Sequence, residues 1–154
     1  MVIAGPTASG KSDFAIALCK ELNGTIINFD SMQVYKELRI LTARPDPVSE
    51  NIVPHKLYGY MSGIDRCSAV LWRNKALEEI KLSLESGHIP ILVGGSGLYI
   101  KALIDGLSDV PMTINTYRKK AESILNKEGL DKFYQRVKVV EPNIANNINI
   151  NDKQ

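Results

Sequence analysis

Apolar positions recur with two different spacings along the first two thirds of the chain, and each spacing predicts a different element. Short, continuous apolar runs predict buried strands at residues 1–4, 25–29 and 89–93. Apolar side chains three or four positions apart predict helices at residues 11–22, 68–86 and 98–104. Strands and helices therefore alternate, which is the order of a parallel sheet covered by helices on both faces.

The longest of these helices has the clearest apolar face. That face is expected to consist of Ala69, Trp72, Ala76, Ile80 and Leu84. We interpret Trp72 as a core residue because it falls at this helical spacing.

Two segments between the predicted elements lack a clear period. Residues 31–41 are mixed, which predicts an irregular or briefly helical segment. Residues 44–54 contain three prolines and predict an ordered loop.

The pattern changes after Pro111, where two amphipathic helices follow with no strand between them. Tyr117 and Leu125 belong to the first of these helices, and Phe133 and Val137 to the second. The sequence thus predicts an α/β core at residues 1–110, with a P-loop NTPase-like parallel sheet. Residues 111–154 are predicted to start a helical insertion subdomain.

Composition narrows the class of protein only a little. The 154 residues suffice for one domain core and little more, and 19 basic residues nearly balance 17 acidic ones. Near-neutrality neither requires nor excludes nucleic acid, since binding needs only a local basic patch. Cys19 and Cys67 are far apart and are interpreted as free thiols in a reducing compartment. No apolar segment reaches the length of a membrane span or resembles a signal peptide, so we expect a cytoplasmic protein without membrane contact.

The first predicted strand leads directly into the chain's most specific local motif, a P-loop. It consists of Gly5, Pro6, Thr7, Ala8, Ser9, Gly10, Lys11 and Ser12. Glycines in such a loop let successive backbone N–H groups approach phosphate oxygens at a helix N-terminus. Lys11 adds a positive charge for the phosphates, and Ser12 offers a hydroxyl to Mg²⁺. The motif leaves the ligand open, because ATP, GTP and a prenyl diphosphate all present such phosphates.

Two further strand ends are expected beside the P-loop. Asp30 follows the second strand, and in a parallel sheet it would emerge at the edge where ligands bind. It could hold Mg²⁺ indirectly, accept a proton, or only cap the following helix. The third strand ends in Gly94-Gly95-Ser96-Gly97, where many P-loop enzymes have an Mg²⁺-orienting aspartate.

Taken together, these segments resemble the tRNA dimethylallyltransferase family. The resemblance runs over nearly the whole chain, and its matching stretches are Gly5 to Ser12, Asp30 to Lys36, Thr42 to Pro45, Val53 to His55 and Gly94 to Tyr99. The stretch from Asp30 to Lys36 is far more specific than the P-loop. The family transfers a dimethylallyl group from dimethylallyl diphosphate to N6 of the adenosine 3′ to the anticodon of tRNA.

The resemblance also implies roles for single residues. The P-loop would hold the diphosphate, with Lys11 on the phosphates and Ser12 on Mg²⁺. Asp30 would be the general base for the adenine amine, and Ser96, where the family usually has threonine, would lie near the diphosphate and the attacking nitrogen. Further contacts to the tRNA anticodon loop would come from Ser31, Met32, Gln33 and Arg118, in addition to Asp30 and Ser96.

The family's sequences continue for roughly as much chain again after this region. The resemblance therefore implies an active parent protein, expected as a monomer, and weak or no activity of this piece alone. Two alternatives stay open. A P-loop ATP-dependent small-molecule kinase would need an Mg²⁺-orienting aspartate that residues 94–96 do not supply. A non-catalytic nucleotide- or RNA-binding module would tolerate Asp30→Ala without effect.

Overall fold

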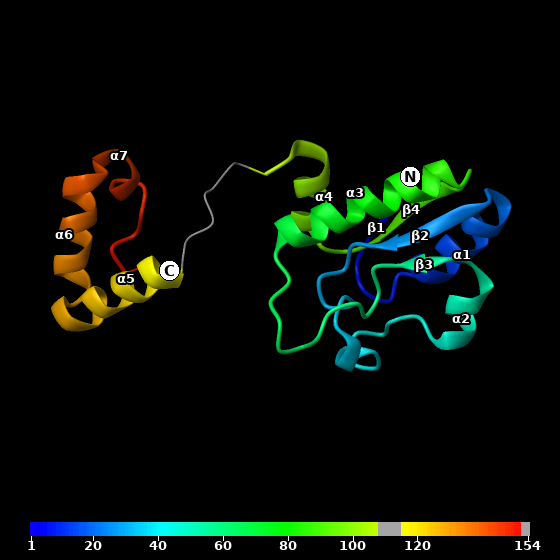
Figure 1. Cartoon of the computed structure of the whole chain (residues 1–154), viewed down its shortest axis with the longest axis horizontal. Coiled ribbons are helices and arrows are strands. Elements are labelled where there is room, and N and C mark those ends of the chain that lie inside the picture. The colour runs from blue at the N-terminus through cyan, green and yellow to red at the C-terminus, as the bar shows by residue number, and fades with distance from the viewer. Residues whose placement is uncertain (108–114, 152–154) are drawn as a thin grey trace. The chain divides into compact units, whose positions relative to one another are not determined.

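The structure, a computed structural model, describes residues 1–107 and 115–151. The chain forms two compact units, Met1–Ser108 and Asp109–Gln154 (Figure 1). The predicted boundary between residues 110 and 111 lies outside the described residues.

A four-stranded sheet forms the centre of the first unit (Figure 1). Its strands are β1 (Val2–Ala4), β2 (Gly24–Asn28), β3 (His55–Lys56) and β4 (Ile89–Gly94), in the spatial order β1-β4-β2-β3. All pairings are parallel, with Ala4 beside Gly94 and Asn28 beside Val93 at the carboxyl ends. The predicted parallel α/β architecture is therefore confirmed.

Helices pack on both faces of this sheet. The longer ones are α1 (Lys11–Glu21), α3 (Ala69–Glu85) and α4 (Gly97–Asp105), and a short α2 (Pro47–Ile52) precedes β3. Side chains of a strand point alternately to its two faces, so neighbouring residues enter different cores. Ile27 and Leu92 pack in the core that contains Trp72 of α3, whereas Ile26 and Ile91 pack in the core that contains Ala15 of α1.

Strand β1 differs from the expectation of a buried strand. Val2 is 47% exposed, and Ile3 is only half-buried. The reason is the position of β1 at one edge of the four strands, where it pairs with β4 alone among the described residues.

The proline-rich segment at residues 44–54 was predicted as a loop, but it contains α2. Asp46 caps this helix by accepting a hydrogen bond from the Ser49 N–H at 2.7 Å, and Pro47 occupies the first turn. Proline is favourable there because its missing N–H would have no partner in the helix. The preceding segment is irregular apart from a 3₁₀ turn at Lys36–Leu38, as expected.

Helix α3 confirms the prediction for residues 68–86, with one correction to its buried face. Trp72 and Ala76 are fully buried, but Leu84 is 60% exposed and Ser83 is buried instead. At about 100° per residue, Ser83 lies about 20° from Trp72 around the helix, whereas Leu84 lies about 120° away. The Ser83 hydroxyl donates to the Glu79 carbonyl at 2.7 Å, so its burial leaves no polar group unpaired.

The second unit consists of helices α5 (Asn115–Glu128), α6 (Leu130–Val140) and α7 (Pro142–Ala145). Gly129, at φ 83°, separates α5 from α6. The Tyr134 hydroxyl on α6 donates to the Ala145 carbonyl at 3.0 Å and so ties α7 to α6. Within residues 1–107 and 115–151, no helix combines the length and the apolar character required to cross a membrane.

Gly94, at the end of β4, lies very close to the end of β2. A Cβ atom at this position would lie 2.6 Å from the Phe29 carbonyl carbon and 2.7 Å from the Asp30 nitrogen. These are backbone atoms, which cannot rotate away as a side chain could. Only glycine therefore permits this approach of the two strand ends.

Replacement of Gly94 by alanine is expected to lower the free energy of unfolding of the first unit by about 1–3 kcal/mol, as overpacking commonly does. Urea unfolding followed by the fluorescence of Trp72, the chain's single tryptophan, measures this change. Gly97→Ala is the matched control, because a Cβ at Gly97 would meet nothing within 4 Å. Equal stability of the two variants would contradict the proposed close approach.

Candidate functional site

The P-loop connects β1 to α1, the context that the motif requires. Its backbone has left-handed conformations at Ala8 (φ 61°) and Gly10 (φ 78°). Helix α1 begins at Lys11, and no side chain caps its first turn. The ammonium group of Lys11 donates to the Pro6 carbonyl across the loop. An uncapped helix N-terminus beside a lysine favours a bound anion.

A pocket of about 370 Å³ lies along this loop and extends to the ends of β2 and β4. Residues 7–12 of the P-loop and Asp13 line one side. The remaining lining residues come from other segments of the first unit: Asp30, Gln33, Thr42, Ala43, Tyr58, Val93 and Gly94. The carboxyl ends of the parallel strands thus meet the P-loop at one edge, as ligand sites of open α/β sheets do.

Asp30 is the carboxylate that the second strand brings to this pocket. It is half-buried, and its backbone N–H donates to Asn28 Oδ1 at 2.8 Å. One carboxylate oxygen, Oδ1, accepts the Met32 N–H at 2.9 Å. Asp30 does not cap a helix as considered from the sequence, because a turn follows it and the 3₁₀ turn at Lys36–Leu38 has no side-chain cap. The same side chain lines the pocket beside Lys11 and Ser12.

Ser96 is held close to Asp30 because it forms a hydrogen bond with Ser31, the residue after Asp30. It is the residue before helix α4, but its hydroxyl does not cap that helix. Instead, Ser96 Oγ accepts the Ser31 N–H at 2.8 Å. This bond joins the loop after β4 to the residue that follows Asp30.

Gln33 and Thr42, in the connection between β2 and α2, and Tyr58, just after β3, also line the pocket. Gln33 Nε2 donates to the Thr42 carbonyl at 2.9 Å, and the Gln33 carbonyl accepts the Gly59 N–H at 2.9 Å. Burial, and secondarily the negative charges of Asp30 and Glu50, raise the pKa of the Tyr58 phenol above its usual range. Tyr58 therefore stays protonated and can act only as a neutral hydroxyl at ordinary pH.

Arg44 is enclosed beside this wall of the pocket. Its guanidinium lies against Gly59, where a Cβ would be 1.7 Å from Nη1. Its Nε is 3.7 Å from Glu50 Oε1, but the same carboxylate already accepts two hydrogen bonds from Arg39, at 2.9 and 3.1 Å. One carboxylate is thus shared by two arginines.

The structure places most of the predicted site residues in or beside this one pocket. Gly5 and Pro6 precede the lining part of the P-loop, and Ser31 and Met32 follow Asp30 directly. Arg118 belongs to the second unit, on the exposed surface of α5, where its Nε lies 3.3 Å from Glu122 Oε1. His55 Nδ1 lies 2.8 Å from the Val53 carbonyl oxygen, within hydrogen-bond distance.

Sequence reasoning missed Asn28 and Tyr58. Asn28 looked like one more residue of a buried strand, and a single polar residue there has no periodic signal. Tyr58 could have been found, since it follows β3 by two residues and the ends of parallel strands gather at the ligand edge.

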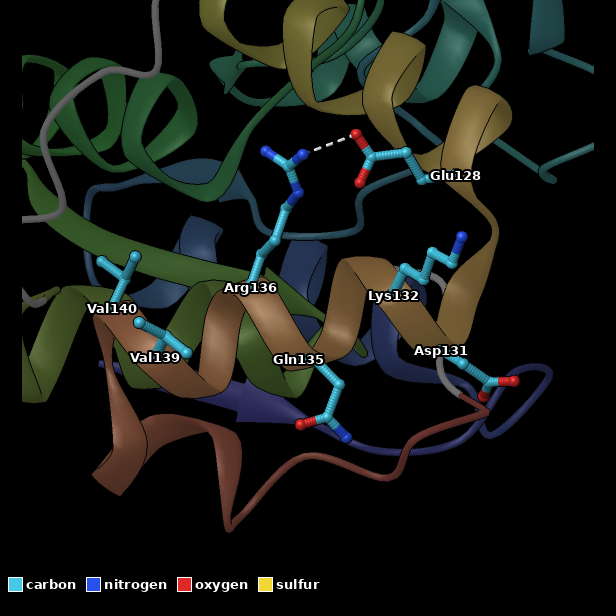
Figure 2. A pocket seen from close by; sticks show the side chains of 7 residues that line it. All are labelled: Glu128, Asp131, Lys132, Gln135, Arg136, Val139 and Val140. Carbon is cyan, nitrogen blue, oxygen red and sulfur yellow. Dashed lines mark hydrogen bonds and ion pairs between the residues drawn. The ribbon is translucent and has the colours of Figure 1, made fainter.

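The second unit carries a separate, open groove along α6 (Figure 2). Arg136 and Glu128 form an ion pair across it at 2.6 Å, and Val139 and Val140 line its apolar end. Figure 2 shows Lys132 and Arg136 projecting from α6. The arrangement offers a mixed surface and lacks the convergence of phosphate-binding groups found at the P-loop.

Two family models match the chain. The model described as "IPP transferase" matches residues 33–154, and the model described as "Isopentenyl transferase" matches residues 1–58. The tRNA dimethylallyltransferase of Granulibacter bethesdensis is 44% identical over 100% of this chain and 48% of its own length. That of Pelagibacter ubique is 42% identical over 100% of this chain and 49% of its own length.

Solved structures show the same relationship. A eukaryotic dimethylallyltransferase described as acting on tRNA is 30% identical, with a TM-score of 0.80 over 98% of this chain and 38% of that one. The tRNA isopentenylpyrophosphate transferase of Bacillus halodurans is 33% identical, with a TM-score of 0.69 over 98% of this chain and 50% of that one.

The chain spans about half the length of the curated relatives it matches. Within that span, the P-loop, the Asp30 segment and the glycine loop after β4 all lie in regions that the family models and the relatives cover. The chain belongs to the IPP transferase family, whose curated relatives are tRNA dimethylallyltransferases.

Proposed function

We propose that the protein containing this chain transfers a dimethylallyl group from dimethylallyl diphosphate to N6 of the adenosine 3′ to the anticodon in tRNA. One observation carries the proposal: a single pocket brings the phosphate-binding P-loop within reach of the Asp30 carboxylate. The relatives are named as enzymes that act on tRNA, and these names support the same activity. An ATP-dependent kinase is disfavoured because Gly94 to Ser96 supply no carboxylate at the end of β4.

The P-loop would bind the diphosphate of the donor. Lys11 and the backbone N–H groups at the start of α1 face the pocket and can neutralise phosphate oxygens. As the allylic C–O bond breaks, negative charge grows on the departing diphosphate, and these groups stabilise it. The Lys11 ammonium would exchange its hydrogen bond to the Pro6 carbonyl for one to phosphate.

Mg²⁺ fits this pocket as a cofactor. Ser12 provides a hydroxyl oxygen beside the Asp13 and Asp30 carboxylates, and oxygen is the ligand that Mg²⁺ prefers. Among the described residues, no group of three or more His, Cys, Asp and Glu side chains could hold a metal alone. This agrees with Mg²⁺ bound mainly through substrate phosphates, with Ser12 as the protein ligand. When bound, Mg²⁺ would add positive charge against the diphosphate.

Asp30 would act as the general base. An adenine amine is a weak nucleophile because its lone pair is delocalised into the ring. A carboxylate that accepts the amine proton as the N–C bond forms accelerates the reaction by about 10²–10⁴-fold. Ser96 would lie beside the reacting groups, since its hydroxyl already contacts the segment after Asp30.

The tRNA anticodon loop would supply the acceptor. An adenosine stacked in a loop must be extruded to reach a pocket, and RNA recognition of this kind favours single-stranded loops. Ser31, Met32 and Gln33 would contact it, and Met32 is 48% exposed beside the pocket. We propose residues 111–154 as a helical tRNA-binding subdomain, in which Arg118 on exposed α5 would contact the tRNA.

We also propose a cytoplasmic monomer. A tRNA substrate calls for the compartment in which tRNA is modified.

The full-length protein that contains this chain is expected to transfer label from dimethylallyl diphosphate to unmodified tRNA. The reaction should depend on Mg²⁺. Nuclease digestion and chromatography of the nucleosides measure the transfer to N6 of adenosine. A parallel assay offers ATP and a mixture of small acceptors. Phosphorylation of an acceptor without prenyl transfer would overturn the proposal in favour of the kinase.

Asp30→Asn is expected to lower kcat by about 10²–10⁴-fold, because the amide cannot accept the proton. Asparagine retains an oxygen for the Met32 N–H, so the local turn is preserved. Steady-state kinetics measure kcat and the KM for the donor. This KM should change little. Asp65→Asn, on an exposed loop, is the control. An equal loss of donor binding would place Asp30 on the metal instead.

Lys11→Ala is expected to weaken pyrophosphate binding about 10–100-fold. This factor corresponds to the loss of one charge-assisted hydrogen bond, which contributes about 1.5–3 kcal/mol. Isothermal titration calorimetry with pyrophosphate and Mg²⁺ measures the dissociation constant. Lys20→Ala is the matched control, since Lys20 is exposed near the other end of α1. Equal affinity of both variants would exclude Lys11 from the phosphate site.

A further inference from the structure

Asn28 is a fully buried polar residue at the end of β2. Its side-chain amide makes three hydrogen bonds. Nδ2 donates to the Asp30 carbonyl at 3.1 Å and to the Leu57 carbonyl at 3.0 Å, and Oδ1 accepts the Asp30 N–H at 2.8 Å. A buried amide is costly unless its groups are paired, and here both N–H donors and the oxygen have partners.

The chemistry of these partners permits only one orientation of the amide. The NH₂ group faces two carbonyl oxygens, and the oxygen faces an N–H, so a rotated amide would lose all three bonds. The backbone carbonyl of Asn28 also accepts the indole N–H of buried Trp72 at 2.9 Å. The backbone of Asn28 is therefore tied to helix α3, while its side chain bonds the segments that follow β2 and β3.

Two walls of the pocket depend on this one amide. It holds the backbone of Asp30 on both sides, at its N–H and at its carbonyl. It also holds Leu57, whose left-handed conformation (φ 62°) precedes Tyr58. Asp30 and Tyr58 line the pocket from different segments, and Asn28 links those segments without lining the pocket itself.

We infer that Asn28 is a positioning residue for the transfer reaction: it sets the place of the Asp30 carboxylate relative to the P-loop and to Tyr58. This inference rests on the proposed function, in which Asp30 is the base. The P-loop does not depend on Asn28, because it is carried by β1 and α1. Loss of the amide should therefore displace the base and leave the diphosphate site in place. A displacement of about 1 Å can cost about 10²-fold in rate.

Two substitutions separate positioning from simple stability. Asn28→Asp keeps the size of the side chain but turns an oxygen toward the carbonyls of Asp30 and Leu57, which repel it. We expect kcat to fall about 100-fold. Asn28→Ser retains a hydroxyl that can accept the N–H two residues ahead, so it should recover part of the rate, to within about tenfold of the original.

The assay uses the full-length protein that contains this chain. Rates are expressed per folded molecule, with the folded fraction measured by circular dichroism. In both variants, the KM for dimethylallyl diphosphate and the affinity for pyrophosphate should stay within about threefold of the unsubstituted protein. Asn74→Asp, the same change at an exposed position of α3, is the control and should alter neither rate nor binding. If Asn28→Asp does not fold, the split between kcat and KM in Asn28→Ser decides.

Three results would overturn the inference. Unchanged kcat per folded molecule in the Asn28 variants, in a protein that transfers the prenyl group, would make Asn28 purely structural. A loss of pyrophosphate affinity as large as the loss of kcat would show that Asn28 supports the whole pocket and not Asp30 in particular. Absence of prenyl transfer by the unsubstituted protein would overturn the proposed function, and the inference with it.

Discussion

The parallel pairing of β2 with β4, and the close contact of their carboxyl ends, is the constraint on which the site depends. The strands pair from Gly24 beside Ile89 to Asn28 beside Val93. Beyond this register, Gly94 approaches the backbone of Phe29 and Asp30 so closely that no side chain fits. Because β1 pairs on the other side of β4, the P-loop emerges at the same edge. The P-loop and the Asp30 carboxylate thus meet in one pocket.

The hydrogen bonds of two side chains, Ser96 and Asn28, fix the segments at this edge after the strands have ended. The Ser96 hydroxyl accepts the Ser31 N–H, and the Asn28 amide holds Asp30 and Leu57. Each bond joins segments that are distant in the sequence or turn away from the sheet. The backbone around Asp30 is consequently held from both neighbouring segments, while its carboxylate remains in the pocket. Such preorganisation is what proton transfer to a positioned base requires.

Much of the fold followed from periodicity, because buried parallel strands and amphipathic helices leave strong patterns. The helix at 68–86 and the strands at 25–29 and 89–93 were predicted nearly to their ends. The errors arose where partners outside the segment decide the outcome. Strand β1 is more exposed than its apolar residues predict, because only β4 pairs with it among the described residues. Helix α2 forms within a proline-rich segment because Asp46 caps it.

The sequence by itself determined the family and the chemical groups available for the candidate site. A P-loop, an aspartate after a strand and a glycine loop with a hydroxyl are local features, written in consecutive residues. The tertiary structure decided what lies beside them. Asn28 and Tyr58 carry no motif, and their importance comes only from burial and from neighbours about 30 positions away along the chain, as in the bond from Asn28 to Leu57 with a separation of 29. Local patterns record the preferences of a segment, whereas contacts between distant segments exist only after the sheet has brought them together.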